Sequence, residues 1–197
     1  MLSPGTALRQ ETDTGAELML RVKEGDSISF NQLLQAHRAP VIHFLYRMVQ
    51  SPVAAEELAQ EVFLRVYRSR NSYEPTAKFT TWLFKIARHL ALNWLRDQRH
   101  ERTQERLDWF SPESARREIS DRRPTVEQQL VREVRWQEVR RAVSSLPATQ
   151  RIAVLMHKYD EMEYAQIAKI LGCSESAVKS LLFRAYETLR VRLAHMR

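Results

Sequence analysis

Apolar residues recur every three or four positions along most of the chain, which is the spacing that places them on one face of an α-helix. The alternation of apolar and polar residues that marks a β-strand is not visible over any useful window. The pattern predicts helices near residues 16–23, after Gly25, after Ser51-Pro52, from Thr80 or Thr81 to about residue 99, from about 126 to 146, and near 148–159, 164–171 and 174–195. We therefore expect an all-α fold.

Local signals mark the ends of the first two helices. Gly25 is placed to end the first helix, and Asp26 or Ser27 is placed to cap the second. Pro40 lies inside the second helical pattern and is expected to kink or briefly break that helix, because proline removes one backbone N–H and crowds the preceding turn.

A change in composition after about residue 99 divides the chain into two small helical domains. Residues 101–125 are charged, contain two prolines and show no sustained apolar period, so they predict a flexible linker. The expected organisation is a flexible arm over residues 1–15, a first domain over 16–100, the linker, and a second domain over 126–197. Leu107, Trp109 and Phe110 leave open an alternative in which the linker docks on a partner or on one of the domains.

The segment from Tyr164 to Ala185 has the spacing of a helix-turn-helix. Gly172 permits the left-handed backbone of a tight turn, the small Ala168 lets the second helix approach, and Ser174 can cap that helix. The side chains that remain outside the core would face the major groove of duplex DNA: Glu175, Ser176, Lys179, Ser180 and Arg184. An ordinary helical hairpin remains the alternative.

Charge adds a second candidate DNA-binding surface. The chain has a formal net charge of +7, which favours an anionic partner, although solubility alone is the plain alternative. On the helix capped by Thr80 or Thr81, the apolar stripe is core, while cations and border residues lie off it. With the preceding loop, these residues predict a surface for single-stranded nucleic acid: Tyr73, Lys78, Trp82, Lys85, Arg88, His89, Asn93 and Arg96. In the alternative, Trp82, Phe79 and Phe84 are core and the cations are a solvated face.

Several classes of protein do not fit the composition. No apolar run approaches the roughly 20 residues of a membrane-spanning helix, and the first residues lack the apolar segment of a secretory signal. Cys173 is the only cysteine, so no intrachain disulfide is possible, and we expect it to pack as a small apolar side chain. No His, Asp or Glu cluster has convincing metal-ligand spacing. We expect a cytoplasmic protein that is not an enzyme and that has no cofactor, no metal and no direct membrane insertion.

Three motifs in a fixed order carry a resemblance to a known family. They are AAEELAQEVFLRVYRS (54–69), FTTWLFKIARHLALNWLR (79–96) and LPATQRIAVLMHKYDEMEYAQIAKILGCSESAVKSLLFRAYETLR (146–190). Together they resemble the extracytoplasmic-function (ECF) group of bacterial sigma-70 factors, over nearly the whole chain. The resemblance implies that 16–100 is sigma region 2 and 126–197 is sigma region 4.

The resemblance also implies partners and roles. Glu56, Glu57, Gln60 and Glu61 would dock on core RNA polymerase. The loop 71–78 and the helix after it would capture a flipped base and the separated strands of the promoter −10 element, and the helix-turn-helix would read the −35 element as duplex. Such a sigma factor acts by recruitment, and an anti-sigma factor is the expected regulator.

Two other functions can be considered from the residues alone. A stand-alone helix-turn-helix regulator would bind duplex operator DNA without polymerase, usually as a dimer. A nuclease is the third possibility, and the lack of a metal-ligand cluster argues against it.

Overall fold

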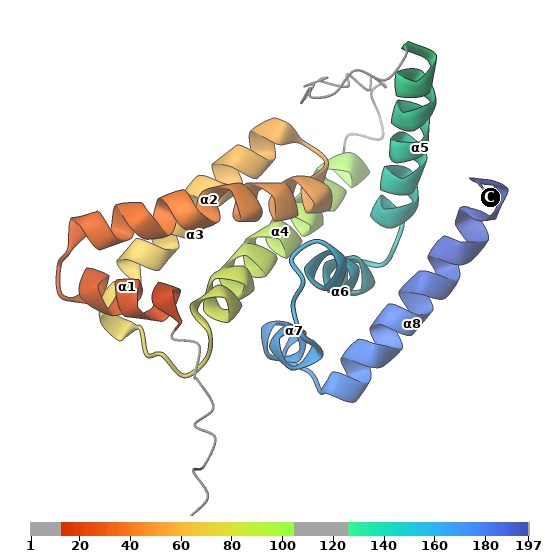
Figure 1. The fold of residues 1–197 in the computed structure, drawn as a ribbon. Coiled ribbons are helices and arrows are strands. Elements are labelled where there is room, and N and C mark those ends of the chain that lie inside the picture. The colour runs from red at the N-terminus through yellow and green to blue at the C-terminus, as the bar shows by residue number, and fades with distance from the viewer. Residues whose placement is uncertain (1–12, 105–125, 197) are drawn as a thin grey trace, which may run out of the picture.

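The computed structural model describes residues 13–104 and 126–196, and in those ranges the chain is helical with no strand. This confirms the all-α prediction. The N-terminal helices are α1 (Thr14–Lys23), α2 (Ser27–Val49), α3 (Pro52–Arg68), the 3-10 turn η1 (Arg70–Ser72) and α4 (Phe79–Gln104). The C-terminal helices are α5 (Val126–Ser144), α6 (Ala148–Lys158), α7 (Tyr164–Leu171), α8 (Glu175–Arg192) and the 3-10 turn η2 (Ala194–Met196). Figure 1 shows the two groups side by side.

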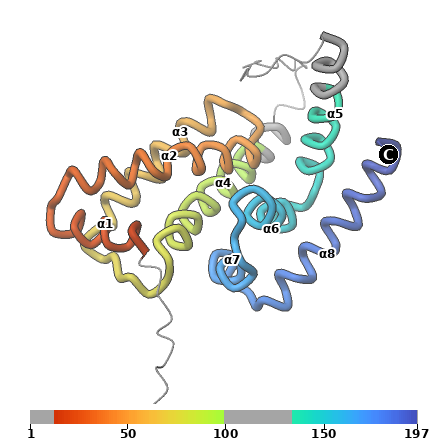
Figure 2. The backbone as a smooth tube through the Cα atoms, in the orientation of Figure 1, coloured from red at the N-terminus to blue at the C-terminus, as the bar shows by residue number. Residues whose placement is uncertain are grey.

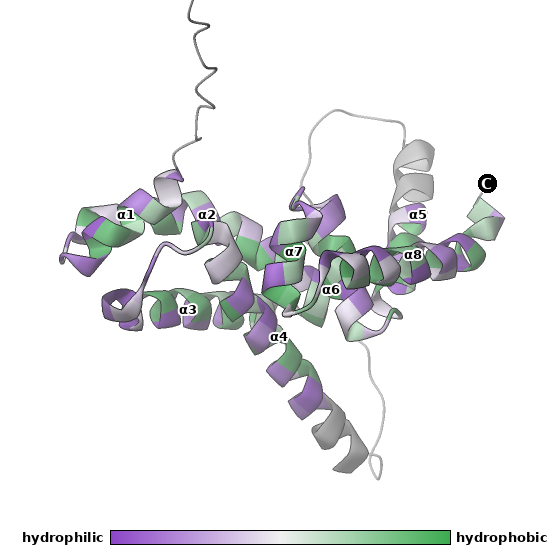
Figure 3. Cartoon of the chain, turned by 90° about the horizontal axis from the view of Figure 1, so that it is seen from below, coloured by the Kyte–Doolittle hydropathy of each residue, from purple (hydrophilic) through white to green (hydrophobic). Residues whose placement is uncertain are grey.

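The first domain is built from α1 to α4. Helices α2, α3 and α4 pack on one another, and α1 lies alongside the start of α2 (Figure 1). Leu33, Phe44, Val62 and Leu83 are fully buried between them. The rings of Phe44 and Phe84 meet edge to face with centroids 5.4 Å apart, a favoured geometry for an aromatic pair. Each helix carries hydrophilic and hydrophobic residues side by side (Figure 3), as the apolar periodicity predicts.

The local sequence signals in the first domain are confirmed at the start of α2 and wrong in its interior. Asp26 caps α2, and its Oδ1 accepts hydrogen bonds from the backbone N–H groups of Ile28 (2.8 Å) and Ser29 (3.3 Å). The expected break at Pro40 is wrong, because α2 runs without interruption from Ser27 to Val49. Proline removes a single hydrogen bond, and the remaining bonds of this long helix, with its buried face around Val41, hold it together.

The second domain holds the helix-turn-helix that the sequence predicts. Helices α6, α7 and α8 pack against one another, and Figure 2 follows the backbone through the turn that joins α7 to α8. Gly172 ends α7 with φ 69°, in the left-handed region that favours glycine. Ser174 caps α8 by accepting a hydrogen bond from the N–H of Ala177 (3.2 Å). The expected packing of Cys173 is wrong, because its side chain is exposed at this turn.

The two domains are docked on each other and share one continuous apolar core. Helix α7 packs against α4, and α6 packs against α2. Arg151 of α6 donates a hydrogen bond to the backbone carbonyl of Met48 (2.8 Å), and Gln166 of α7 donates one to the Thr80 hydroxyl (2.9 Å). The predicted linker, with Leu107, Trp109 and Phe110, lies outside the described residues, as do residues 1–12 of the predicted arm.

Candidate nucleic-acid and polymerase interfaces

Helix α4 presents one cationic face to solvent. Five residues follow one another along α4 at intervals of three or four positions, so they lie on one side of the helix: Trp82, Lys85, His89, Asn93 and Arg96. Lys85, His89 and Arg96 are exposed, whereas Trp82 and Asn93 are half-buried. Among the described residues Arg96 pairs with its neighbour Asp97, at 3.3 Å between two exposed side chains, so its charge is still available to a partner.

The predicted residue Arg88 and two neighbouring rings stand apart from this face. Arg88 is half-buried, with its Nε atom buried and without a hydrogen-bond partner. Phe79 and Phe84 are buried, so the alternative that made them core is correct for these two rings. The single-strand surface that fits the geometry is therefore narrower than the set predicted from the sequence.

The loop before α4 does not present Tyr73 to solvent. Tyr73 is buried, and its ring lies 4.9 Å from the Trp82 ring and 6.3 Å from the Phe79 ring. Burial raises the pKa of the Tyr73 hydroxyl to about 12, and the nearby Asp13 carboxylate adds to this. The prediction that this ring accepts a base does not fit the burial. Glu74 and Lys78 are the exposed charged residues of the loop.

The cap of α4 also differs from the prediction. The helix begins at Phe79, so Thr80 and Thr81 lie inside its first turn, and neither serves as the residue before the helix. The N–H of Phe79 donates a hydrogen bond to the Asp13 carboxylate, 2.5 Å away and 66 residues earlier in the sequence. Asp13 was missed because a cap supplied from a distant segment leaves no local sequence signal.

The predicted polymerase-binding residues on α3 differ in exposure and in whether their side chains form ion pairs. Glu57 and Gln60 are exposed, whereas Glu56 pairs with Arg38 and Glu61 pairs with Arg65, each at 2.7 Å. Two exposed apolar side chains, Val53 and Leu64, share the face of Glu57 and Gln60 at helical spacing. This face of α3 therefore combines polar groups with apolar area, which suits a protein partner.

The recognition helix α8 exposes all five residues predicted to face DNA: Glu175, Ser176, Lys179, Ser180 and Arg184. Val178, Leu182 and Ala185 occupy the opposite face and are buried. The sequence reasoning missed Phe183, which is 69% exposed and borders a shallow hollow with Lys179, Ser180 and Arg184. An exposed ring between two cations can contact a thymine methyl group or a partner side chain.

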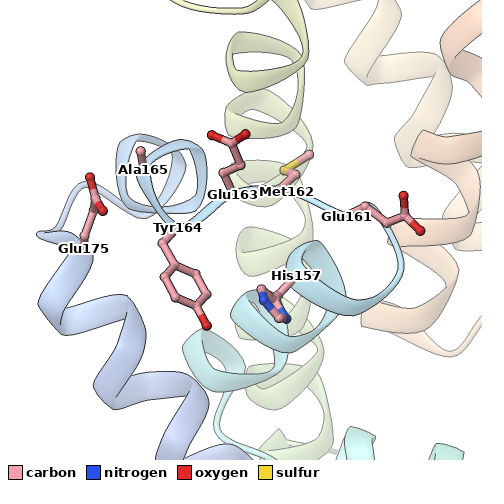
Figure 4. A pocket seen from close by; sticks show the side chains of 7 residues that line it. All are labelled: His157, Glu161, Met162, Glu163, Tyr164, Ala165 and Glu175. Atoms are coloured by element: carbon pink, nitrogen blue, oxygen red, sulfur yellow. The ribbon is translucent and has the colours of Figure 1, made fainter.

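Beside the start of α8 lies an open hollow of about 560 Å³ with acidic walls (Figure 4). Glu161, Glu163 and Glu175 border it, and the Tyr164 ring stacks on the ring of His157 at 5.2 Å. Within the described ranges, no group of His, Cys, Asp and Glu side chains is arranged to hold a metal ion. Three carboxylates would repel a phosphate, so the hollow does not suit the DNA backbone, although Glu175 at its border also belongs to the predicted −35 set.

No helix in the described part of the chain is long and apolar enough to cross a membrane.

Comparisons with known proteins find matches in both domains of this chain. The sequence model of Sigma-70 region 2 matches residues 33–101, and that of Sigma-70, region 4 matches residues 136–189. RNA polymerase sigma factor CarQ of Myxococcus xanthus is 34% identical over 179 residues, which cover 90% of this chain and 97% of CarQ. The ECF RNA polymerase sigma-E factor of Escherichia coli strain K12 is 30% identical over 181 residues, which cover 89% of this chain and 92% of that protein.

Two solved structures share the fold. The structure of CnrH in complex with the cytosolic domain of CnrY matches with a TM-score of 0.68 at 18% identity, over 93% of this chain and 99% of the solved chain. The sigma factor RpoE in complex with the anti-sigma factor NepR from Bartonella quintana matches with a TM-score of 0.67 at 23% identity, over 85% and 98%. The two region matches, the full-length relatives and the shared fold place this chain in the sigma-70 family, as an ECF sigma factor that directs RNA polymerase to promoters.

Proposed function

We propose that this sigma factor holds promoter DNA on two separate surfaces. The outer face of α4 binds the opened −10 strand, and the exposed face of α8 reads the −35 element as duplex. The observation that carries the proposal is the single face of α4 on which Trp82, Lys85, His89, Asn93 and Arg96 follow one another at helical spacing. Cations along a helix hold a phosphate backbone, and a half-exposed indole offers a ring edge to an unstacked base.

The −35 surface is supported by the exposure of Lys179 and Arg184 on α8. Lys179 lies in the first half of the helix, the part that a recognition helix lays into the major groove, and Arg184 lies near its middle. The Lys179 ammonium lies 5.9 Å from the centre of the Tyr164 ring, which restrains it near the start of the helix. We propose that these two cations contact phosphates or guanine edges, while Glu175, Ser176 and Ser180 contact neighbouring bases.

Core RNA polymerase binds the open face of α3 in this proposal. Glu57 and Gln60 make the polar contacts, and Val53 and Leu64 supply apolar area. Glu56 and Glu61 act mainly through their pairs with Arg38 and Arg65, which keep both cations folded back along the helices. The protein is not an enzyme in this scheme, and it works in the cytoplasm, where the polymerase and the promoter are found.

An anti-sigma factor is the proposed regulator. The solved RpoE that shares this fold was captured with the anti-sigma factor NepR. A stand-alone operator-binding regulator is not supported, because relatives match this chain over region 2 as well as region 4.

The test replaces two exposed cations of the α4 face, Lys85→Ala with Arg96→Ala, and assembles the variant with core RNA polymerase. We expect at least a tenfold loss of transcription from duplex promoters. Each lost phosphate contact to a single strand should also flatten the salt dependence of binding to a pre-opened −10 template by about 0.7 in logarithmic slope. The matched control is Arg21→Ala with Lys158→Ala, which removes the same charge from exposed positions elsewhere. Equal losses in both double variants would refute a specific α4 surface.

A further inference from the structure

Helix α4 starts without a cap of its own. The residue before it is Lys78, whose side chain has no hydrogen-bond acceptor, although its backbone carbonyl accepts bonds from the N–H groups of Thr81 (2.9 Å) and Trp82 (3.4 Å). Helices α2, α3 and α8 begin instead after Asp26, Ser51 or Ser174, whose side chains accept first-turn N–H groups. The free N–H groups at a helix start need an acceptor, so for α4 it must come from elsewhere.

The acceptor is the carboxylate of Asp13, at the start of α1. Its Oδ2 accepts the hydrogen bond from the N–H of Phe79 (2.5 Å), and its Oδ1 accepts one from the N–H of Gly15 (3.2 Å). One side chain therefore joins the first turns of α1 and α4. A negative charge near both helix starts also interacts favourably with the positive end of each helix dipole.

Gly15 makes this close approach possible. A Cβ atom placed on Gly15 would lie 2.9 Å from the Cβ atom of Phe79, which is closer than real side chains come. The Phe79 side chain is fully buried, and its ring lies 6.0 Å from the ring of Trp82. The first turn of α1 is thus seated directly on the residue that starts α4.

The other end of α1 holds the other end of the loop. The Lys23 ammonium donates a hydrogen bond to the backbone carbonyl of Tyr73 (3.1 Å), and Tyr73 is the residue where the loop leaves η1. Between Tyr73 and Phe79 the exposed loop residues include Glu74 and Lys78. The α1 segment is therefore hydrogen-bonded to both ends of the loop, while the loop residues between the two ends are mostly exposed.

We propose that α1 is a positioning element for promoter opening: Asp13 and Gly15 fix one end of the loop 73–79, and Lys23 fixes the other, so that the loop meets the opened −10 strand already in shape. The inference rests on the proposed role of the α4 face. A loop that is ordered before binding avoids the entropy loss that binding would otherwise impose. Asp13 acts through the loop, since its carboxylate is occupied by two backbone N–H groups.

The experiment measures how tightly the holoenzyme, assembled with core RNA polymerase, binds a template whose −10 element is pre-opened by mismatches. Asp13→Ala removes both acceptor oxygens, and Asp13→Asn keeps one of the two. Lys23→Met removes the other anchor but keeps the apolar stem. We expect Asp13→Ala and Lys23→Met to weaken this binding by about 5- to 30-fold, with unchanged affinity for core polymerase. Asp13→Asn can accept only one of the two N–H groups, so it should weaken the binding, but less than Asp13→Ala does.

Asp26→Ala is the matched control. It deletes an aspartate cap of the same kind, but from α2, where Asp26 bonds to Ile28 and Ser29 and not to the loop. Equal weakening by Asp13→Ala and Asp26→Ala would show a general loss of stability and overturn the inference. Tighter binding by Asp13→Ala, or weaker binding by Asp13→Asn than by Asp13→Ala, would overturn it as well. If Lys85→Ala with Arg96→Ala also binds normally, the proposed α4 surface itself fails; if only the α1 variants bind normally, the positioning role alone fails.

Discussion

Asp160 lies in the loop between α6 and α7, and its Oδ2 atom is buried without a hydrogen-bond partner. Burial raises the pKa of this carboxyl group from 3.8 to about 7, although the charge of Arg47, across the domain boundary, lowers it in part. The Arg47 guanidinium lies 4.1 Å above the centre of the ring of Tyr159. The perturbation we choose is Asp160→Asn, which keeps the shape of the side chain and removes its titratable carboxyl group.

The raised pKa sets the sign of the effect. Between pH 3.8 and about 7 the folded protein keeps the Asp160 proton, while the unfolded chain has released it. Raising the pH through this window therefore lowers the free energy of unfolding, and above about pH 7 the full cost remains. One pKa unit corresponds to about 1.36 kcal/mol, so a shift of roughly three units sets an upper limit of about 4 kcal/mol. Partial solvent access reduces this, and we expect about 1–2 kcal/mol between pH 5 and pH 7.5.

The assay is urea unfolding of the wild type and of Asp160→Asn at several pH values from 5 to 8. The wild type should lose stability relative to the variant as the pH rises, and the variant should be the more stable of the two at pH 7.5. The control is Asp26→Asn. The pKa of Asp26 is lowered by its hydrogen bonds to Ser29, so Asp26 changes charge only below this pH range, and its variant should run parallel to the wild type. Parallel profiles for the wild type and Asp160→Asn would refute the reasoning.

Two further predictions concern the stability of each domain. Leu83→Ala removes a fully buried side chain from α4 and should cost about 2–5 kcal/mol in chemical denaturation, whereas a loss below about 1 kcal/mol would contradict the packing described for that helix. Gly172→Ala should cost roughly 1–2 kcal/mol, seen as a lower melting temperature, because a Cβ atom there meets open space and the whole effect is the left-handed backbone, so an unchanged melting temperature would refute it.

The sequence predicted the features that depend on short spacings. Helical periodicity located the described helices, and the outward positions of α8 are exposed as expected. The cap at Asp26 and the turn at Gly172 follow from the preferences of single residues. Each of these signals lies within one or two helical turns, so a single sequence contains all the information needed.

What the sequence did not predict depends on residues that are distant in the chain. Asp13 caps a helix that begins 66 residues later, and Tyr73 is buried by rings and by α1, so neither fact has a local pattern. The docking of the two domains was missed for the same reason, because the charged segment 101–125 suggested independent domains. The polar contacts at this boundary join residues such as Gln166 and Thr80, which look like ordinary surface residues when the sequence is considered alone.

Domain docking and the proposed DNA binding use different sides of α4. Thr80 accepts the hydrogen bond from Gln166, so the side of α4 that carries Thr80 faces α7. Trp82 follows two residues later, roughly 200° further around the helix, and Lys85, His89 and Arg96 lie near Trp82. Docking therefore leaves the cationic face open, just as it leaves Lys179 and Arg184 exposed on α8. If both proposed surfaces bind DNA, the domain boundary sets the distance and angle between them. A substitution of Arg47 or Asp160 should then change the promoter spacing that supports transcription more than it changes the affinity of either surface for DNA.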